Sequence, residues 1–344
     1  MTTLASLLGT ELPLIQAPMA GVQDEALAIA VAHAGGLGSM PCAMLDSARL
    51  EAALQAFAPL AQPVNLNFFC HAMAEPAAAE AQRWRTALAP YYDEFGIAPP
   101  TPSTAGARRP LDAATVDVLE AFRPRIVSFH FGLPDAALLL RIKAWAATVL
   151  SSATTLEEGV WLQRHGVDAV IAQGIEAGGH RGHFLSDDLS GQPGTRALVA
   201  SLSKTLTVPV IGAGGVGDRA DVQALFAVGA SAVQAGTAYL LCPDATTSAV
   251  HRTALQQPEH AGAITNLFSG RAARGLVNRL MRDLGPMSDL PPAFPWAAQA
   301  LAPLRAAAEA RGRDDFSPLW SGTRPGTLAG RNAAQVTRQL MGVA

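Results

Sequence analysis

Apolar and polar residues alternate along this chain in blocks. Short apolar runs bounded by Gly or Pro are separated by Ala- and Leu-rich stretches in which apolar residues recur at helical spacing. Parallel strands covered by helices on both faces give this pattern, because both faces of each strand are buried. The pattern predicts eight strands, at residues 12–17, 36–40, 64–69, 126–131, 148–151, 169–172, 208–211 and 232–234. It predicts helices between them, for example at residues 25–33, 47–57, 135–146, 155–164 and 219–228.

Eight strands that alternate with helices predict a (β/α)8 TIM barrel of the α/β class, which needs about 250 residues. The chain has 344 residues, and two regions interrupt the alternation: residues 75–114, and the segment after His251, which indicates helices and no further strand. We therefore expect residues 1–257 to form the barrel and residues 258–311 to form a small helical lid, or substrate domain. Residues 312–344 are expected to return to the barrel.

Composition narrows the class of protein. Hydrophobic residues make up 49% and charged residues 15%, which allows a large buried core. The formal net charge is −3 and Lys and Arg form no long run, so we expect no nucleic-acid partner. The three cysteines have no metal-ligand or disulfide spacing, which favours a reducing compartment. With no signal-like start and no apolar run near the roughly 20 residues of a membrane span, we expect a soluble cytoplasmic protein without a membrane partner.

Two glycine-containing loops follow the last two predicted strands. Gly212-Ala213-Gly214-Gly215 ends one strand, and Gln234-Ala235-Gly236-Thr237 ends the next. Glycine lets the backbone turn with positive φ and bring N–H groups close to an anion, and TIM barrels often bind phosphate at these two loops. One such loop alone would equally indicate a tight turn, but two in succession predict a phosphate site that includes Gly214, Gly215, Gln234, Ala235, Gly236 and Thr237.

A histidine follows the predicted strand at 169–172, in a run from Gln173 to His183 that contains Gly178, Gly179 and Gly182. Barrel active sites lie at this end of the strands, and imidazole suits proton transfer near neutral pH. His180 is therefore the candidate catalytic residue. His183 is the alternative, and the two together could bind a metal. Because no Asp, Glu or Cys completes a ligand set, we expect no metal.

Three further polar or adaptable side chains are predicted near strand ends. Met19 follows the first strand, Asn67 lies in the third and His130 in the fourth. Each could instead fill the core or be a buried polar residue bonded to backbone, but position favours the site. We expect His130 and His183 to contact substrate.

The motifs together resemble the nitronate monooxygenase family, formerly called 2-nitropropane dioxygenases, and most closely its class I members. The resemblance covers nearly the whole chain. It rests on the segments 16–21, 67–69, 128–132, 176–182, 214–215, 234–237, 268–275 and 315–320.

The resemblance implies an FMN-dependent enzyme that oxidises alkyl nitronates, notably propionate 3-nitronate, with O2 to a carbonyl compound and nitrite. It implies that His180 is the catalytic base or positions the nitronate, under a lid that restricts water. It also implies a set of FMN contacts: Met19, Asn67, Gln173, Gly178, Gly215, Gln234, Ala235, Gly236 and Thr237. No motif indicates which cation would bind a carboxylate on the substrate.

Two other functions fit the same motifs. An FMN-dependent enoyl-acyl-carrier-protein or quinone reductase that uses NAD(P)H would share the Glu-Ala-Gly-Gly-His run and the phosphate loops. A flavin-binding sensor without catalysis is the non-enzyme alternative, because a fold alone does not establish activity. The amphipathic lid also offers a surface for a homodimer.

Overall fold

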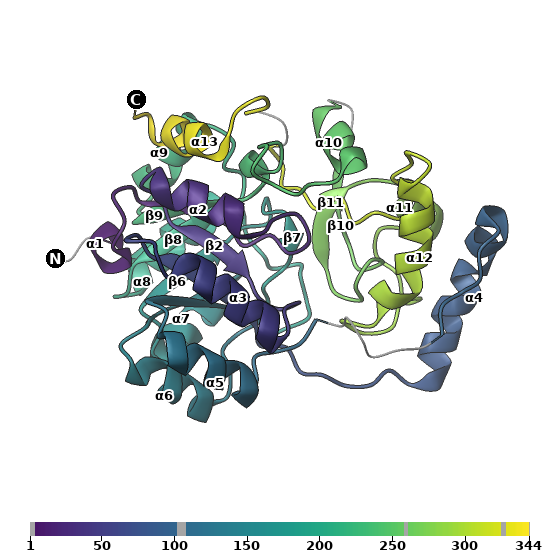
Figure 1. Ribbon diagram of the computed structural model, residues 1–344, viewed down its shortest axis with the longest axis horizontal. Coiled ribbons are helices and arrows are strands. Elements are labelled where there is room, and N and C mark those ends of the chain that lie inside the picture. Colours follow the sequence, from purple (N-terminus) through teal and green to yellow (C-terminus); the bar gives the residue numbers. More distant parts are fainter. Residues whose placement is uncertain (1–3, 102–107, 258–260, 325–327, 344) are drawn as a thin grey trace.

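Eight parallel strands form the barrel, in the sheet order β1-β9-β8-β6-β5-β4-β3-β2 (Figure 1). The computed structural model describes residues 4–101, 108–257, 261–324 and 328–343. The sheet closes between β1 and β2, where the N–H of Leu37 donates to the carbonyl of Leu14 at 2.8 Å. All eight predicted strands, and with them the TIM barrel, are confirmed. The strands are β1 (Leu14–Gln16), β2 (Gly38–Pro41), β3 (Val64–Phe69), β4 (Ile126–His130), β5 (Thr148–Ala153), β6 (Ala169–Gln173), β8 (Val210–Ala213) and β9 (Ala232–Ala235).

Helices connect successive strands and cover the outside of the barrel. Side chains that bond first-turn N–H groups set where they begin: Asp46 accepts from Arg49 N, and Thr155 accepts from Glu158 N. The helices predicted at 25–33 and 47–57 are confirmed to the residue, and the other three lie within two residues of their predicted bounds. These elements are α1 (Leu4–Leu8), α2 (Glu25–His33), α3 (Ser47–Phe57), α5 (Ala113–Phe122), α6 (Ala136–Ala144), α7 (Leu156–Arg164), α8 (Thr195–Thr205), α9 (Arg219–Ala227), the 3-10 helix η1 (Thr237–Tyr239), α10 (Ala249–Gln256) and α13 (Ala333–Met341).

The barrel interior is apolar at the N-terminal ends of the strands and more polar towards their C-terminal ends. Leu4 and Leu8 of α1 pack in one buried cluster with Ile15 of β1, and this closes the N-terminal end of the barrel. Towards the other end, the buried Asn67 side chain donates from Nδ2 to Ser128 Oγ at 2.9 Å. The polar groups therefore face the C-terminal ends of the strands, where TIM barrels carry their active sites.

A second lobe lies beside the barrel and contains a sheet as well as helices (Figure 1). Its helices are α4 (Ala78–Phe95), α11 (Arg279–Leu284) and α12 (Ala297–Glu309). Its antiparallel sheet has the order β10-β11-β7, with β10 (Gly262–Thr265), β11 (Ala273–Leu276) and β7 (Gly179–His180). The prediction of a purely helical lid without strands after His251 was therefore wrong. Strands this short, with glycine inside them, leave too little periodicity to be recognised from sequence.

The core of the second lobe draws on distant parts of the chain. Trp84 of α4 is 1% exposed, and its indole N–H donates to the Ala297 carbonyl at 3.1 Å. The same buried cluster includes Leu301 of α12 and Phe316. This core combines residues that precede the predicted boundary at 257/258 with residues that follow the one at 311/312, so both boundaries cut across it.

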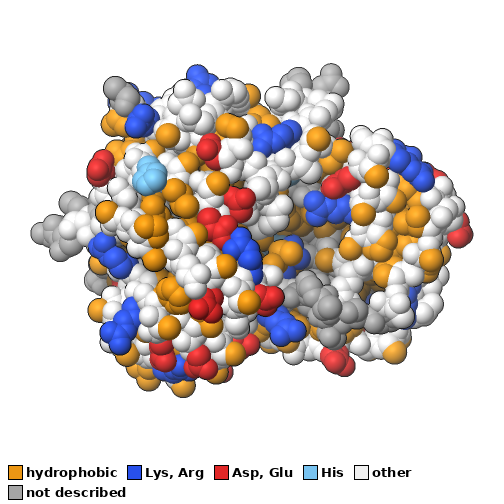
Figure 2. All heavy atoms as spheres, in the orientation of Figure 1, with side chains coloured by type: hydrophobic (Ala, Val, Ile, Leu, Met, Phe, Trp, Pro, Cys, Tyr) orange, Lys and Arg blue, Asp and Glu red, His pale blue; other side chains and the backbone are white. Residues whose placement is uncertain are grey.

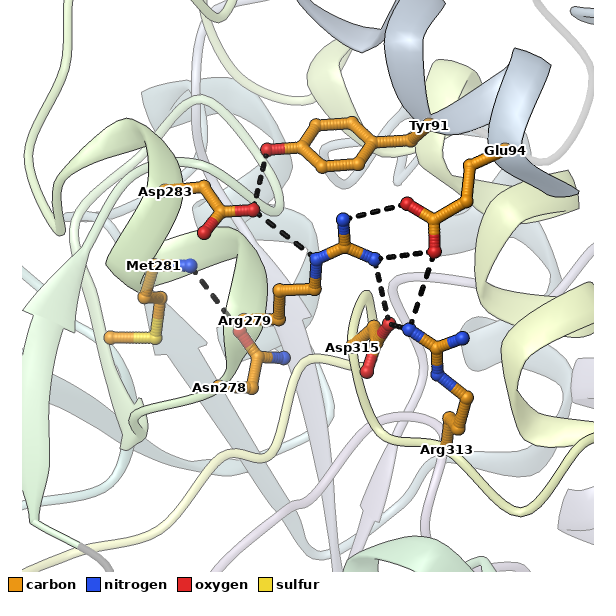
Figure 3. Close-up of polar contacts among 8 residues, drawn as sticks. All are labelled: Tyr91, Glu94, Asn278, Arg279, Met281, Asp283, Arg313 and Asp315. Carbon is orange, nitrogen blue, oxygen red and sulfur yellow. Dashed lines mark hydrogen bonds and ion pairs between the residues drawn. The ribbon is translucent and has the colours of Figure 1, made fainter.

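An ion-pair network holds α4 against the rest of the second lobe (Figure 3). Arg279 of α11 pairs with Glu94 of α4 at 2.7 Å, and with Asp283 and Asp315 at 3.3 Å each. The Tyr91 hydroxyl donates to Asp283 Oδ2 at 3.0 Å. Partly exposed pairs of this kind contribute little to stability, so the network mainly orients α4, while the aromatic core beneath it supplies the packing energy.

The C-terminal helix α13 packs against α2 and α9 of the barrel. The Tyr239 hydroxyl, in η1, lies 2.9 Å from Thr337 Oγ1 of α13, and both side chains are buried. Across the described ranges, every helix is too short or too polar to cross a membrane.

Candidate active site

A cavity lies where the C-terminal ends of the barrel strands meet the second lobe. The face drawn in Figure 2 is hollowed between the two lobes. Every predicted site residue except His183 lines the cavity, namely Met19, Asn67, His130, Gln173, Gly178, His180, Gly214, Gly215, Gln234, Ala235, Gly236 and Thr237. Residues far apart in sequence meet here because parallel strands share one end.

The loop after β8 lines one part of the cavity with bare backbone. Gly214 and Gly215 have φ of +121° and +68°, a region that glycine enters freely. A Cβ on Gly214 would lie 2.7 Å from Thr195 Oγ1 and 2.8 Å from the backbone N of Ala177, so no larger side chain fits without moving the chain. Consecutive uncovered peptide groups of this kind suit an anion such as phosphate.

The loop after β9 adds a second bare segment and an unsatisfied acceptor. A Cβ on Gly236 would lie 3.4 Å from Met19 Sδ, and Thr237 Oγ1 accepts from the N–H of Gly322 at 2.9 Å. The Oε1 of Gln234 is buried and has no hydrogen-bond partner among the described residues. Because buried polar atoms in folded proteins are nearly always paired, this oxygen marks a position for a donor from a bound molecule.

Two side chains of the barrel hold the carbonyl oxygen of His180. His180 lies opposite Ala273 in the pairing of β7 with β11. Its carbonyl accepts from Nε2 of Gln173 at 2.9 Å and contacts Nε2 of His130 at 3.1 Å. The Oε1 of Gln173 in turn accepts from the N–H of Gly182 at 2.8 Å. Gln173 and His130 therefore position the histidine at the mouth of the barrel.

The imidazole of His180 is oriented by a hydroxyl from the second lobe. Ser269 Oγ donates to the Arg271 carbonyl at 3.2 Å and lies 2.9 Å from His180 Nε2. This arrangement assigns the ring proton to Nε2 and leaves Nδ1 as an acceptor. The rings of Phe294 and Trp320 have their centroids 5.3 and 5.6 Å from the imidazole. Burial, followed by nearby cations, lowers the pKa of His180 well below its ordinary value, so the ring is neutral at pH 7.

Comparison with known proteins assigns the chain to a family. The family model described as nitronate monooxygenase matches residues 1–340. A nitronate monooxygenase from Paraburkholderia phytofirmans is 40% identical over 342 residues, 98% of this chain and 93% of the relative. Another from Pseudomonas aeruginosa is 40% identical over 339 residues, 97% of each protein. The chain belongs to the nitronate monooxygenase family.

Solved structures share the fold of this family member. Nitroalkane oxidase from Streptomyces ansochromogenes matches with a TM-score of 0.88 at 33% identity, over 98% of this chain and 96% of that one. FabK from Thermotoga maritima matches with a TM-score of 0.71 at 21% identity, over 99% and 96% of the two chains, a likeness of the fold alone. The family predicted from the motifs is thus confirmed, and the protein is an oxidoreductase.

His183, which was predicted to contact substrate, does not line the cavity that the other predicted site residues share. The chain turns back after β7 because the buried Arg181 donates to the carbonyls of Gly174 and Gln173 at 2.7 and 2.9 Å. This turn carries His183 away from the cavity, to a position where its Nε2 lies 3.7 Å from Asp187 Oδ1.

Several cavity residues were not predicted from the sequence. They are Arg108, His251, Trp320 and Arg324, with Ser269 behind His180. Trp320 ends one of the segments that carry the family resemblance, which was the available signal. Ser269 also lies in such a segment, 268–275. Arg108, His251 and Arg324 come from segments without a strand-end pattern, so their position depends on how the second lobe packs.

We expect acid to destabilise this family member through its buried histidines. Burial lowers the pKa of His71, His183 and His251 to about 4 in each case. In the unfolded chain each has a pKa near 6.5, so the unfolded state binds more protons between these values and stability falls as pH falls. Each histidine should lower the free energy of unfolding by about 2 kcal/mol when the pH falls from 7.5 to 5. Urea unfolding at the two pH values measures this loss, and equal free energies of unfolding would contradict it.

Proposed function

We propose that this enzyme binds FMN in the cavity and oxidises alkyl nitronates, such as propionate 3-nitronate, with O2 to a carbonyl compound and nitrite. The observation that carries the proposal is the juxtaposition of the two bare glycine loops with a neutral, oriented His180 in one cavity. Family membership supports it, because relatives of 40% identity bear the name nitronate monooxygenase.

The residues present fit a flavin mononucleotide. The loops at Gly214–Gly215 and Gly236–Thr237 would hold the phosphate, since both line the cavity with glycine backbone that no side chain covers. The unpaired Gln234 Oε1 offers an acceptor to a ring N–H. Met19, Asn67, Gln173 and Gly178 would lie along the ring. Bound FMN would supply the electron transfer between nitronate and O2.

His180 would hold the nitronate rather than create it. A neutral imidazole with a depressed pKa is a weak base, so it removes a proton from a carbon acid poorly. A nitronate is already deprotonated at that carbon and needs only orientation and charge stabilisation. The hydrogen bond to Ser269, together with the Phe294 and Trp320 rings, keeps the imidazole in one orientation for this task.

The second lobe would exclude water from the reacting groups. Trp320 lines the cavity. The centroid of the Phe294 ring lies 5.3 Å from that of His180 and 6.2 Å from that of Phe69 in β3. An apolar cover of this kind strengthens the electrostatic interactions beneath it.

We infer a cytoplasmic enzyme of small-molecule substrates, in keeping with the net charge of −3 and the absence of spanning helices in the described ranges.

An anaerobic visible spectrum of the purified protein tests the proposal. Flavin bands that bleach or shift on addition of propionate 3-nitronate alone, followed by O2 uptake and nitrite release in air, are the expected result. Bleaching by NADH or NADPH alone would favour the reductase alternative. Protein that carries no flavin and binds none on addition of FMN would overturn the proposal.

A further inference from the structure

One cation that lines the cavity has no ion pair with a carboxylate of the described residues. Arg108 lines the cavity at the end of the segment that runs from α4 back to the barrel. The residues after it are fixed on the barrel rim: Arg109 N donates to the Ala43 carbonyl at 3.0 Å, and Leu111 N donates to the Phe69 carbonyl at 2.8 Å. These bonds hold the backbone of Arg108 beside the C-terminal end of β3.

The guanidinium of Arg108 is largely buried, and one of its nitrogens is unsatisfied among the described residues. Its Nε is buried and lacks a hydrogen-bond partner among the described residues. Burial lowers its pKa, and the neighbouring charge that adds to this effect is another cation, Arg305. A buried charge is costly unless an opposite charge or a set of hydrogen bonds satisfies it. The site therefore suits a bound anion.

The other arginine that lines the cavity contrasts with it. The Nε of Arg324 also lacks a hydrogen bond among the described residues, but this guanidinium has carboxylates beside it: it is paired with Asp218, and its Nε lies 3.2 Å from Asp221 Oδ2. These carboxylates lie just after the Gly214–Gly215 loop, at the cavity's phosphate end, and already balance its charge. The charge of Arg108 is instead felt at His180. After burial, it is the largest influence that lowers the pKa of that imidazole.

We propose that Arg108 binds a carboxylate on the substrate, opposite the nitronate group held at His180, and so selects short nitronates with an anionic tail. The planar guanidinium can donate two parallel hydrogen bonds to one carboxylate, which alkyl tails cannot accept. Occupation by the carboxylate would satisfy the unpaired Nε. This inference rests on the proposed function for the identity of the reacting group.

Steady-state oxygen uptake tests the assignment with two substrates, propionate 3-nitronate and the uncharged-tail butyl nitronate. In Arg108→Met, kcat/KM for propionate 3-nitronate should fall about 10- to 100-fold, the usual loss for a charged hydrogen-bonded pair. For butyl nitronate it should change by less than about threefold. Arg108→Lys, which keeps the charge, should recover part of the loss. Arg109→Met is the matched control, because Arg109 is exposed and is bonded through its backbone.

Succinate binding, measured by calorimetry, separates this inference from the proposed function. Wild type should bind succinate and Arg108→Met should bind it at least tenfold more weakly, with equal FMN content as the test of folding. If wild type oxidises neither nitronate, the proposed function fails, yet this difference in succinate affinity would still support an anion site at Arg108. Equal succinate affinity, or equal losses of kcat/KM with both nitronates, would overturn the role of Arg108.

Discussion

Replacement of His180 by asparagine should lower kcat for nitronate oxidation about 100-fold or more while FMN remains bound. Asparagine is polar and smaller than histidine, so the fold should tolerate it. It cannot keep an acceptor at the position of Nδ1 while also reaching Ser269, which now lies 2.9 Å from Nε2. It also loses the ring that packs against Phe294 and Trp320. Oxygen uptake and nitrite release measure the loss, and the ratio of flavin to protein absorbance measures FMN content.

The matched control is His183→Asn, in the same loop. His183 is 5% exposed, close to the burial of the site residues, but does not line the cavity. We expect its asparagine variant to keep kcat within about threefold, far less than the loss expected when a group that stabilises charge on the substrate is removed. The assignment of His180 fails if His180→Asn turns over at the wild-type rate, or if the His183 variant is the one that loses activity with FMN retained.

Replacement of Gly215 by valine should release the cofactor, with an increase of about 100-fold in the Kd for FMN, roughly 3 kcal/mol. Gly215 has a φ of +68° and lines the cavity, so a branched side chain there is strained and also occupies space beside the proposed phosphate position. Fluorescence titration of the apoprotein with FMN measures the affinity. The variant should remain folded, with little flavin after purification.

Gly312→Val separates backbone strain from loss of the phosphate position. Gly312 has a φ of +69°, matching Gly215, but has open space around it and does not line the cavity. Valine there should carry the same conformational cost and leave FMN affinity unchanged. A Gly215→Val enzyme that is fully loaded with FMN would contradict the proposed phosphate site.

Much of the barrel was determined by local sequence. The helices at 25–33 and 47–57 were predicted to the residue from the helical spacing of their apolar residues, and the structure shows that capping side chains such as Asp46 fix where they begin. The eight strands were predicted because parallel strands buried on both faces leave short apolar runs between glycines and prolines. Closure of such a barrel brings all strand ends to one rim, so Met19 and Gln234 could be placed together from sequence.

The second lobe was decided by tertiary structure. β10 and β11 have four residues each, and they are stable because they pair with each other and with the loop that holds His180. Strands of four residues are too short to show a period, and β7 is distant from β11 in sequence, so neither pairing could be read locally. Trp84 joined this core for the same reason, since the partners that bury its ring follow it by some 200 positions, as the bond to Ala297 shows.

The sequence by itself determined the barrel, the glycine loops and the strand-end position of His180, because each depends on residues that are neighbours along the chain. Tertiary structure decided which side-chain atoms reach the cavity and which partners they have. It set Ser269 against one nitrogen of His180, turned His183 away from the cavity, and left Arg108 in it with its Nε unpaired among the described residues. Charge compensation and hydrogen-bond partners depend on what surrounds a side chain in space, and those neighbours come from segments whose spacing carries no pattern.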